Sequence, residues 1–178
     1  IVEHHTSHAY TSLYSSGFIK DNNPILIFTI DNSGDGISST VSEWNPSDGF
    51  VRHHQNQAFN SLGELYSKVT EALGMKPGEH EYKIMGMSPY VPDEYSQEVF
   101  EILLKNYVNL SKDKTKFVNR ASHGPALLNK LKKEFSGHRF DNICAGVQRH
   151  FEYLVYSWVK SWQSKLGIKS ACFSGGCF

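Results

Sequence analysis

The stretch Ile25-Leu26-Ile27-Phe28-Thr29-Ile30, followed by Asp31-Asn32-Ser33-Gly34-Asp35-Gly36, decides the fold. Residues 25–30 are nearly all β-branched, aromatic or aliphatic, and an apolar run of this length next to turn residues is typical of a buried β-strand. Residues 31–36 are glycines and small polar residues, which favour tight turns. We therefore expect a buried strand over residues 25–30 that leads Asp31 into a turn over residues 31–36.

The residues that follow this turn predict more strands. Residues 37–44 alternate in places between apolar and polar, and the turn signal at residues 45–49 separates them from a third strand over residues 50–55. Three strands joined by tight turns form an antiparallel meander. A short strand over residues 168–173, which ends at Ser174-Gly175-Gly176, is expected to join the meander in one mixed sheet.

Apolar residues that recur every three or four positions predict helices around this sheet. The Gly-containing stretch 74–90 shows no such period and is expected to be irregular, and Asp93 is expected to cap the helix that follows it. Helices that follow a meander and precede a final strand indicate an α/β fold. The predicted helices cover residues 3–16, 61–73, 93–107, 125–135 and 141–167.

The composition limits the possible functions. Lys and Arg together number 18, as do Asp and Glu, so charge gives no reason to expect nucleic acid or an anionic membrane as the main partner. No run approaches the roughly 20 apolar residues of a membrane span. The three cysteines, Cys144, Cys172 and Cys177, form no pairing motif and suit a reducing compartment, which predicts a cytoplasmic protein. Because the chain begins without Met and stops just after a Gly-Gly pair, we expect it to be a piece of a larger protein.

Three histidines lie in the first eight residues, Ile1-Val2-Glu3-His4-His5-Thr6-Ser7-His8. In a helix, His4 and His8 lie one turn apart on one face, with Cβ atoms about 5–6 Å apart, so both imidazoles can bind one metal ion. His5 points roughly 100° away from them. Two ligands alone do not define a site, because metal sites normally have three or four. The alternative is a histidine-rich helix start whose rings are satisfied by water or by neighbouring groups.

Two predicted turns could bind a phosphate group. In the first, Asp31 would lie beside free backbone N–H groups that can hold phosphate oxygens, while its carboxylate holds a cation or orients a nucleophile. The alternative is an ordinary hairpin with Asn and Gly at positive φ. In the second, Gly175 and Gly176 at a strand exit would let a nucleotide approach the backbone closely, although such pairs are common.

Three further residue types have weaker functional signals. Lys83 lies among apolar residues, so it could bind an anionic ligand or extend to the surface. His53 and His54 are adjacent on a predicted strand, and their side chains therefore point to opposite faces and cannot easily share one ion. Cys144, near the start of a buried helix stripe, is expected to be a core residue.

Taken in order, four stretches resemble the nodulation-protein-type O-carbamoyltransferase family. Residues 2–9 match its Val-Glu-His-His-x-x-His-Ala motif, and residues 31–36 match its Asp-Gly-x-Gly-Asp-Gly turn. Residues 81–90 match its Glu-Tyr-Lys-x-Met-Gly-x-x-Pro-Tyr motif, and residues 174–178 match its Ser-Gly-Gly strand exit. Asn32 replaces a glycine of the family turn, and asparagine is among the residues that best tolerate left-handed geometry.

This resemblance implies an actin-like ATPase fold of the sugar kinase type. Residues 1–24 would end its first lobe, and residues 25–178 would form most of the second lobe. The implied activity is transfer of a carbamoyl group from carbamoyl-adenylate, made from ATP and carbamoyl phosphate, to a hydroxyl group of a small-molecule acceptor. The resemblance also implies a YrdC-like domain in the same parent chain, which makes the adenylate, and no part of this sequence matches that domain.

The resemblance also implies roles for individual residues. His4 and His8 would be metal ligands, with iron as the implied metal, and a third ligand, an Asp, would lie beyond residue 178. Asp31 and Lys83 are the catalytic candidates, although the resemblance gives Lys83 no defined role. The residues expected to line the phosphate loop or approach the adenylate are Asp31, Ser33, Gly34, Gly36, Gly175 and Gly176.

Two other functions remain open. A relative with the same fold threonylcarbamoylates tRNA and also has a His-x-x-x-His pair, but the turn at residues 31–36 and the motif at residues 81–86 favour the O-carbamoyltransferase. The second alternative is a non-catalytic nucleotide-binding or metal-binding module. Since the chain lacks the adenylate-forming domain, we expect no turnover from these 178 residues alone.

Overall fold

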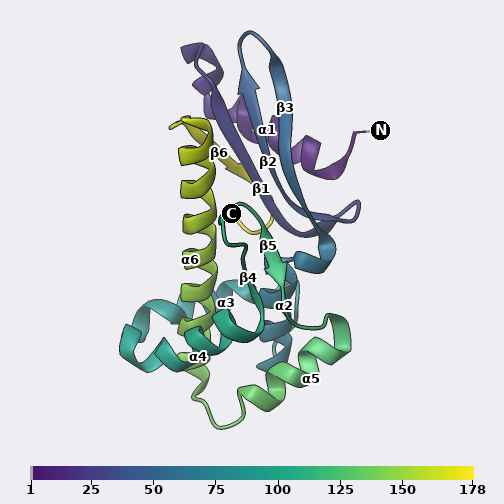
Figure 1. Ribbon diagram of the computed structural model, residues 1–178. Helices are drawn as coiled ribbons and strands as arrows, with labels where there is room; N and C mark the ends of the chain where they lie inside the picture. Colours follow the sequence, from purple (N-terminus) through teal and green to yellow (C-terminus); the bar gives the residue numbers. More distant parts are fainter. Residues whose placement is uncertain (1) are drawn as a thin grey trace. The chain divides into compact units, whose positions relative to one another are not determined.

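The computed structural model describes residues 2–178 and divides them between two compact units (Figure 1). The first unit contains the residues up to Gly63, residues 110–117 and residues 157–178. The second unit contains residues 64–109 and 118–156. Strands and helices occur together in one chain, which confirms the predicted α/β class. The predicted lobe boundary at residue 24 stays a prediction.

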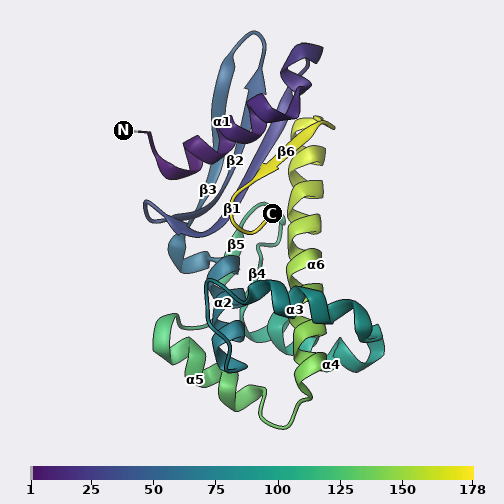
Figure 2. The same cartoon turned by 180° about the vertical axis from the view of Figure 1, so that it is seen from behind.

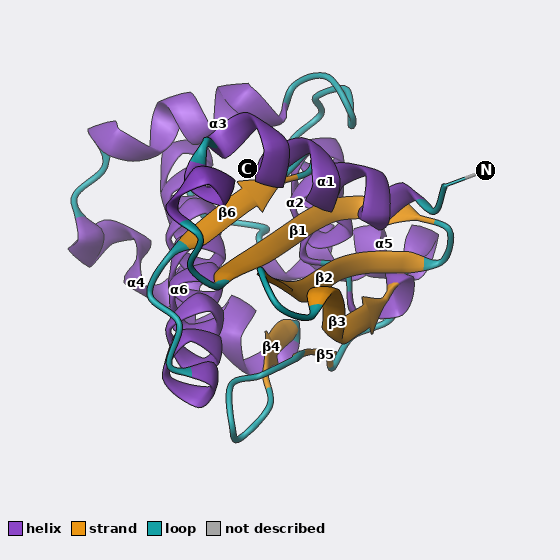
Figure 3. Cartoon of the chain, turned by 90° about the horizontal axis from the view of Figure 1, so that it is seen from above, coloured by secondary structure: helices purple, strands orange, loops and turns teal. Residues whose placement is uncertain are grey.

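The first unit is organised on a four-stranded mixed sheet with the order β3-β2-β1-β6 (Figure 3). The first three strands form the predicted antiparallel meander, and the last strand pairs parallel to β1, with Leu26 opposite Ala171 and Thr29 opposite Ser174. The prediction of one mixed sheet is therefore confirmed. The strands are β1 (Ile25–Gly34), β2 (Ile37–Asn45), β3 (Gly49–Gln57) and β6 (Ala171–Ser174).

Helix α1 (His4–Ser16) packs across one face of this sheet, along β1 and β6 (Figure 2). Successive strand residues point to opposite faces, so the apolar run of β1 supplies both layers. On the α1 face, Ile25 and Ile27 form a buried cluster with residues of α1 and β6, namely Ala9, Leu13 and Cys172. On the other face, Phe28 packs edge-to-face against Trp158, with ring centroids 5.1 Å apart. This two-sided burial fixes the position of residues 25–30, and so where Asp31 lies.

The predicted six-residue turn after Ile30 is wrong. β1 continues to Gly34, and its pairing with β2 shifts register between Ile30 and Gly34, which is typical of a β-bulge. Only Asp35 and Gly36 form the reversal, and both have positive φ, 52° and 79°. The bulge accommodates the extra polar residues within the strand, so the reversal itself needs only two residues, as in a tight hairpin.

The second unit is largely helical. Val99 of α4 meets α6 at Gly146, where a Cβ atom would lie 2.5 Å from Val99 Cγ1, so glycine permits a close helix contact. α4 has Pro92 as its N-cap, so the predicted cap residue Asp93 lies in the first turn instead. No helix within residues 2–178 is both long enough and apolar enough to cross a membrane. The helices that contribute to this unit are α2 (Leu62–Ala72), α3 (Glu81–Met87), α4 (Asp93–Asn106), α5 (Gly124–Glu134) and the first part of α6 (Phe140–Leu166).

The prediction that residues 74–90 are irregular is also wrong, because this stretch contains α3 and the short 3₁₀ helix η3 (Ser88–Tyr90). Ile84 is the buried residue of α3. Glu81 accepts hydrogen bonds from Gly78 N–H and Ser67 Oγ–H, both at 2.7 Å. Tertiary contacts thus stabilise a helix too short to show a period. The two other 3₁₀ helices are η1 (Phe18–Asp21) and η2 (Ala58–Asn60), and a two-stranded sheet of β4 (Val108–Leu110) and β5 (Phe117–Asn119) was not predicted from the sequence.

Candidate metal centre

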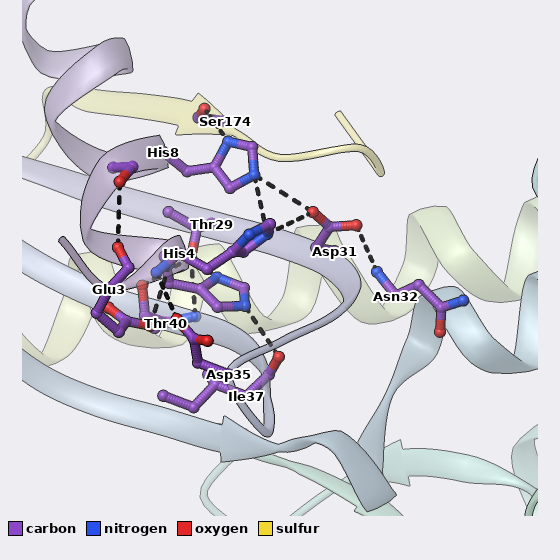
Figure 4. Close-up of polar contacts among 12 residues, drawn as sticks. Glu3, His4, His8, Thr29, Asp31, Asn32, Asp35, Ile37, Thr40 and Ser174 are labelled. Carbon is purple, nitrogen blue, oxygen red and sulfur yellow. Dashed lines mark hydrogen bonds and ion pairs between the residues drawn. The ribbon is translucent and has the colours of Figure 1, made fainter. Parts of the chain in front are cut away.

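Two imidazoles of α1 and one carboxylate of β1 converge on a single point (Figure 4). Asp31 Oδ2 lies 2.9 Å from His4 Nε2 and 3.3 Å from His8 Nε2, and the two Nε2 atoms are 3.2 Å apart. Within residues 2–178, these three side chains are the one group of His, Cys, Asp or Glu residues arranged so that they could hold a metal ion. The helical spacing predicted that the two histidines lie on one face, and Asp31 was predicted as part of a separate turn. The fold brings all three side chains together.

The helical spacing of α1 explains why His4 and His8 face each other. Their ring centroids are 4.6 Å apart with an interplanar angle of 78°, as a spacing of one helical turn predicts. α1 begins at His4 because Glu3 accepts hydrogen bonds from the backbone N–H groups of His5 and Thr6. Arg52 Nη2 donates to Glu3 Oε2 at 2.6 Å and thereby ties this cap to β3.

His5 points away from the cluster and is fully buried against the sheet. Its Nε2–H donates to the carbonyl oxygen of Ile37 at 3.0 Å, so its Nδ1 accepts from the hydroxyl of Thr29 at 2.7 Å. The Thr29 oxygen in turn accepts from the Thr40 backbone N–H at 3.2 Å. Burial lowers the pKa of His5, so the ring is neutral in the folded protein. Both ring nitrogens are already used, which excludes His5 as a ligand.

Asp31 presents one carboxylate oxygen to the histidines because the other is occupied. Its Oδ1 accepts the Asn32 backbone N–H at 2.7 Å, while Oδ2 faces both rings. Burial acts to raise the pKa of Asp31, but the hydrogen bond from His4 and the Asn32 N–H outweigh burial and hold that pKa below its ordinary value. Asp31 is therefore a carboxylate at neutral pH.

The exit of β6 lies beside this cluster. His8 Nδ1 is 3.4 Å from Ser174 Oγ. Gly175 has φ +114°, and a Cβ atom there would lie 2.1 Å from the Ile30 carbonyl oxygen. A Cβ atom at Gly176 would lie 3.1 Å from Asp31 Oδ1. The glycine pair singled out in the sequence thus packs against the end of β1, with its backbone next to Asp31.

The other predicted loop residues have different positions. Ser33 is exposed, and Gly36 forms the reversal. Gly34 packs against the His4 ring, and Asp35 Oδ2 accepts the His4 backbone N–H at 2.9 Å. Asp35 was not predicted as a site residue, because its partner lies 31 residues away and no local pattern signals such a contact.

Lys83 does not belong to this cluster. It lies on the exposed side of α3, in the second unit, and its Nζ is 5.8 Å from the centroid of the Tyr82 ring. His53 pairs with Glu43 at 2.8 Å, and His54 stacks on Trp162, so neither histidine joins the cluster. Cys144 is buried, as predicted, and burial raises the pKa of its thiol to about 11.

Comparisons with known proteins agree on one family. The family model described as Carbamoyltransferase N-terminus matches residues 1–178. The chain is 30% identical to an uncharacterised protein of Synechocystis sp., sll1178, over 98% of the chain and 29% of that protein. It is 27% identical to nodulation protein NolO of Bradyrhizobium diazoefficiens (98% of the chain, 31% of that protein) and 28% identical to nodulation protein NolNO of Sinorhizobium fredii (98% and 25%). The chain therefore spans less than a third of the length of these relatives.

Proposed function

Because the chain belongs to the carbamoyltransferase N-terminus family, we propose that it forms part of an enzyme that transfers a carbamoyl group to a hydroxyl group of a small-molecule acceptor. The observation that carries this proposal is the convergence of His4, His8 and Asp31 beside the point where the parallel pairing of β1 with β6 ends. In open α/β sheets, ligands bind in crevices outside the carboxyl ends of such strands. The cluster therefore lies where a substrate of this fold class is expected.

The three side chains fit one divalent metal ion. Their ligand atoms are separated by 2.9, 3.2 and 3.3 Å. An ion with bonds of about 2.0–2.2 Å holds neighbouring ligand atoms about 3 Å apart, so the three separations suit ligands of one ion. Two histidines and one carboxylate suit iron(II) with open coordination positions. We propose iron as the metal, with His4, His8 and Asp31 as its ligands from this chain.

The residues around the ligands support this assignment. Ser174 Oγ lies 3.4 Å from His8 Nδ1, and with a proton on Nδ1 donated to this oxygen, Nε2 would be unprotonated and free to bind the metal ion. The Asn32 N–H holds the second oxygen of Asp31 and thereby fixes the orientation of the carboxylate. A bound metal ion would supply Lewis-acid polarisation of the carbamoyl carbonyl and a template for the acceptor hydroxyl.

The glycines at the β6 exit supply the proposed binding surface for the donor. Gly175 and Gly176 expose backbone beside Asp31, and a backbone without side chains lets a phosphate or adenylate group approach closely. We propose that carbamoyl-adenylate binds here, formed from ATP and carbamoyl phosphate by a YrdC-like domain of the same protein, and that the actin-like ATPase fold is the parent architecture. Ser33, near the end of β1, and Gly36, in the β1–β2 reversal, would border this surface.

A metal titration tests this proposal. We expect purified protein to bind one equivalent of Co(II), and His8→Ala to weaken that binding by more than about 100-fold, because loss of a ligand costs at least as much as loss of a supporting residue. His53→Ala is the matched control, since its ring bonds to Glu43 and should leave Co(II) affinity unchanged. In the whole protein, His8→Ala should also abolish carbamoyl transfer while leaving the circular dichroism spectrum intact. Full metal content in His8→Ala would rule out this histidine as a ligand.

A further inference from the structure

The His4 ring occupies the space that a side chain at position 34 would fill. A Cβ atom added to Gly34 would lie 2.2 Å from both Cγ and Cδ2 of His4 and 2.7 Å from its Nε2. Such separations are far shorter than the 3.5–4.0 Å at which carbon atoms normally meet. The imidazole therefore rests directly on the backbone of β1.

The backbone conformation does not explain why position 34 is a glycine. Gly34 lies within β1 and, unlike Gly36, does not have a positive φ. Gly36 has φ +79° and would meet no atom within 4 Å if it carried a Cβ, so the turn requires glycine there. At position 34 the requirement comes from the ring that packs against it.

The same strand and its turn hold His4 at three points. The ring lies on Gly34, its Nε2 is 2.9 Å from Asp31 Oδ2, and its backbone N–H donates to Asp35 Oδ2 at 2.9 Å. A ring lifted off Gly34 would carry Nε2 away from Asp31, because both contacts involve the same rigid imidazole. The contact with Gly34 thus sets the direction of Nε2.

We propose that Gly34 is a positioning residue for His4: the bare backbone of β1 is the surface that orients the imidazole toward Asp31 and His8. This role rests on the proposed metal site, although the contact between His4 and Gly34 itself needs no metal. A methyl group at position 34 would displace the ring and misdirect one ligand, while the other two ligands stay in place.

A double-mutant cycle tests the proposal with two readouts, the dissociation constant for Co(II) and the urea midpoint of metal-free protein. We expect Gly34→Ala to raise the dissociation constant by about 10–100-fold, as for other residues that orient a ligand. It should also lower the urea midpoint. In the His4→Ala background, the same substitution should no longer lower the midpoint, because the ring that meets the methyl group is gone. Gly86→Ala, where a Cβ meets no atom within 4 Å, is the matched control and should leave Co(II) affinity unchanged.

The two readouts separate this proposal from the proposed function. An equal fall in the midpoint with and without the His4 ring would overturn the positioning role, as would unchanged Co(II) affinity in Gly34→Ala. Failure of the unmodified protein to bind Co(II), with the coupling in the midpoints intact, would count against the metal site and leave the ring contact supported. If Gly34→Ala does not fold, a folded His4→Ala/Gly34→Ala double variant supports the contact, and an unfolded double variant contradicts it.

Discussion

At the scale of single residues, His150 makes the folded protein sensitive to acid. The side chain is fully buried in the second unit, and its Nε2–H donates to the Val108 carbonyl oxygen at 2.8 Å. Burial lowers its pKa from 6.5 to about 4, because the charged form loses its hydration. The unfolded chain therefore binds a proton that the folded chain does not. The titration of His150 has almost no effect on stability above pH 6.5, and between pH 6.5 and pH 4 it lowers the free energy of unfolding by up to about 3 kcal/mol.

Urea unfolding at pH 7.5 and pH 5 measures this effect. We expect His150→Gln to lose less stability than the unmodified protein when the pH falls, since Gln can donate to Val108 but does not titrate. His123→Gln, at an exposed position, is the control and should keep the original pH dependence. Equal pH dependence in His150→Gln would show that His150 is not the titrating group.

Helical spacing alone predicted that His4 and His8 would face each other and that His5 would not. This worked because both rings belong to one helix, whose geometry is local. Asp31 and Asp35 contact His4 across 27 and 31 residues of sequence, and no local period encodes such contacts. The contact between Gly34 and the His4 ring is also distant in sequence. Gly34 was therefore predicted to line a phosphate loop, whereas in the structure the His4 ring leaves no room for a side chain at this position.

At the scale of elements, two glycines of the second unit test how the local backbone conformation decides the effect of a Gly→Ala substitution on stability. Gly86 lies inside α3, and Gly74 follows α2 with φ +79°; a Cβ at either position would meet no atom within 4 Å. We expect Gly86→Ala to stabilise the protein by about 0.5–1 kcal/mol, because alanine loses less backbone entropy in a helix. Gly74→Ala should destabilise it, because its backbone conformation disfavours a Cβ. Urea midpoints of the two variants give the signs, and stabilisation by both substitutions would contradict this explanation.

Elements were predictable where a hydrophobic period extends over several turns or a whole strand. α6 and the second and third strands of the meander, β2 and β3, satisfied this condition, and their predicted bounds were wrong by at most two residues. α3 has one buried residue, Ile84, and so no period. β1 extends beyond its predicted end because Gly34 still pairs with Ile37 after a bulge. Residues 31–34 have the composition of a turn, so the sequence did not predict this pairing.

At the scale of the whole chain, the mixed sheet was predictable but the division into units was not. The predicted sheet needed only that β6 be a strand of the same layer as the meander. Each compact unit combines segments that are far apart in the sequence; the first unit, for example, joins residues up to Gly63 with residues 110–117 and 157–178. Such joining depends on tertiary contacts such as Trp158 Nε1–H to the Thr115 carbonyl oxygen at 3.0 Å, which composition does not reveal.

The charge of the whole chain bears on the choice between a small acceptor and tRNA. Docking of tRNA requires several Lys or Arg side chains that are free to neutralise phosphates, and its affinity then falls steeply with salt. Here 18 basic residues balance 18 acidic ones. Helix α5 carries a cluster of three lysines, Lys130, Lys132 and Lys133. Lys130 donates to the Asn106 carbonyl oxygen and lies 3.9 Å from Glu134, while Lys132 and Lys133 are exposed.

We therefore expect no binding to bulk tRNA tighter than about 1 µM at physiological salt, the range of weak non-specific association. Fluorescence titrations of labelled tRNA at low and physiological salt measure this, with the whole protein as well as the 178-residue chain, so that domains outside the chain are included. Replacing Lys132 and Lys133 by Glu should leave the weak binding unchanged if these lysines only face water and do not contact tRNA. Sub-micromolar binding that depends steeply on salt and is lost in the double variant would contradict this expectation. A tRNA would then be the acceptor to test first, because an enzyme for a small hydroxyl compound has no need of a site for a polyanion.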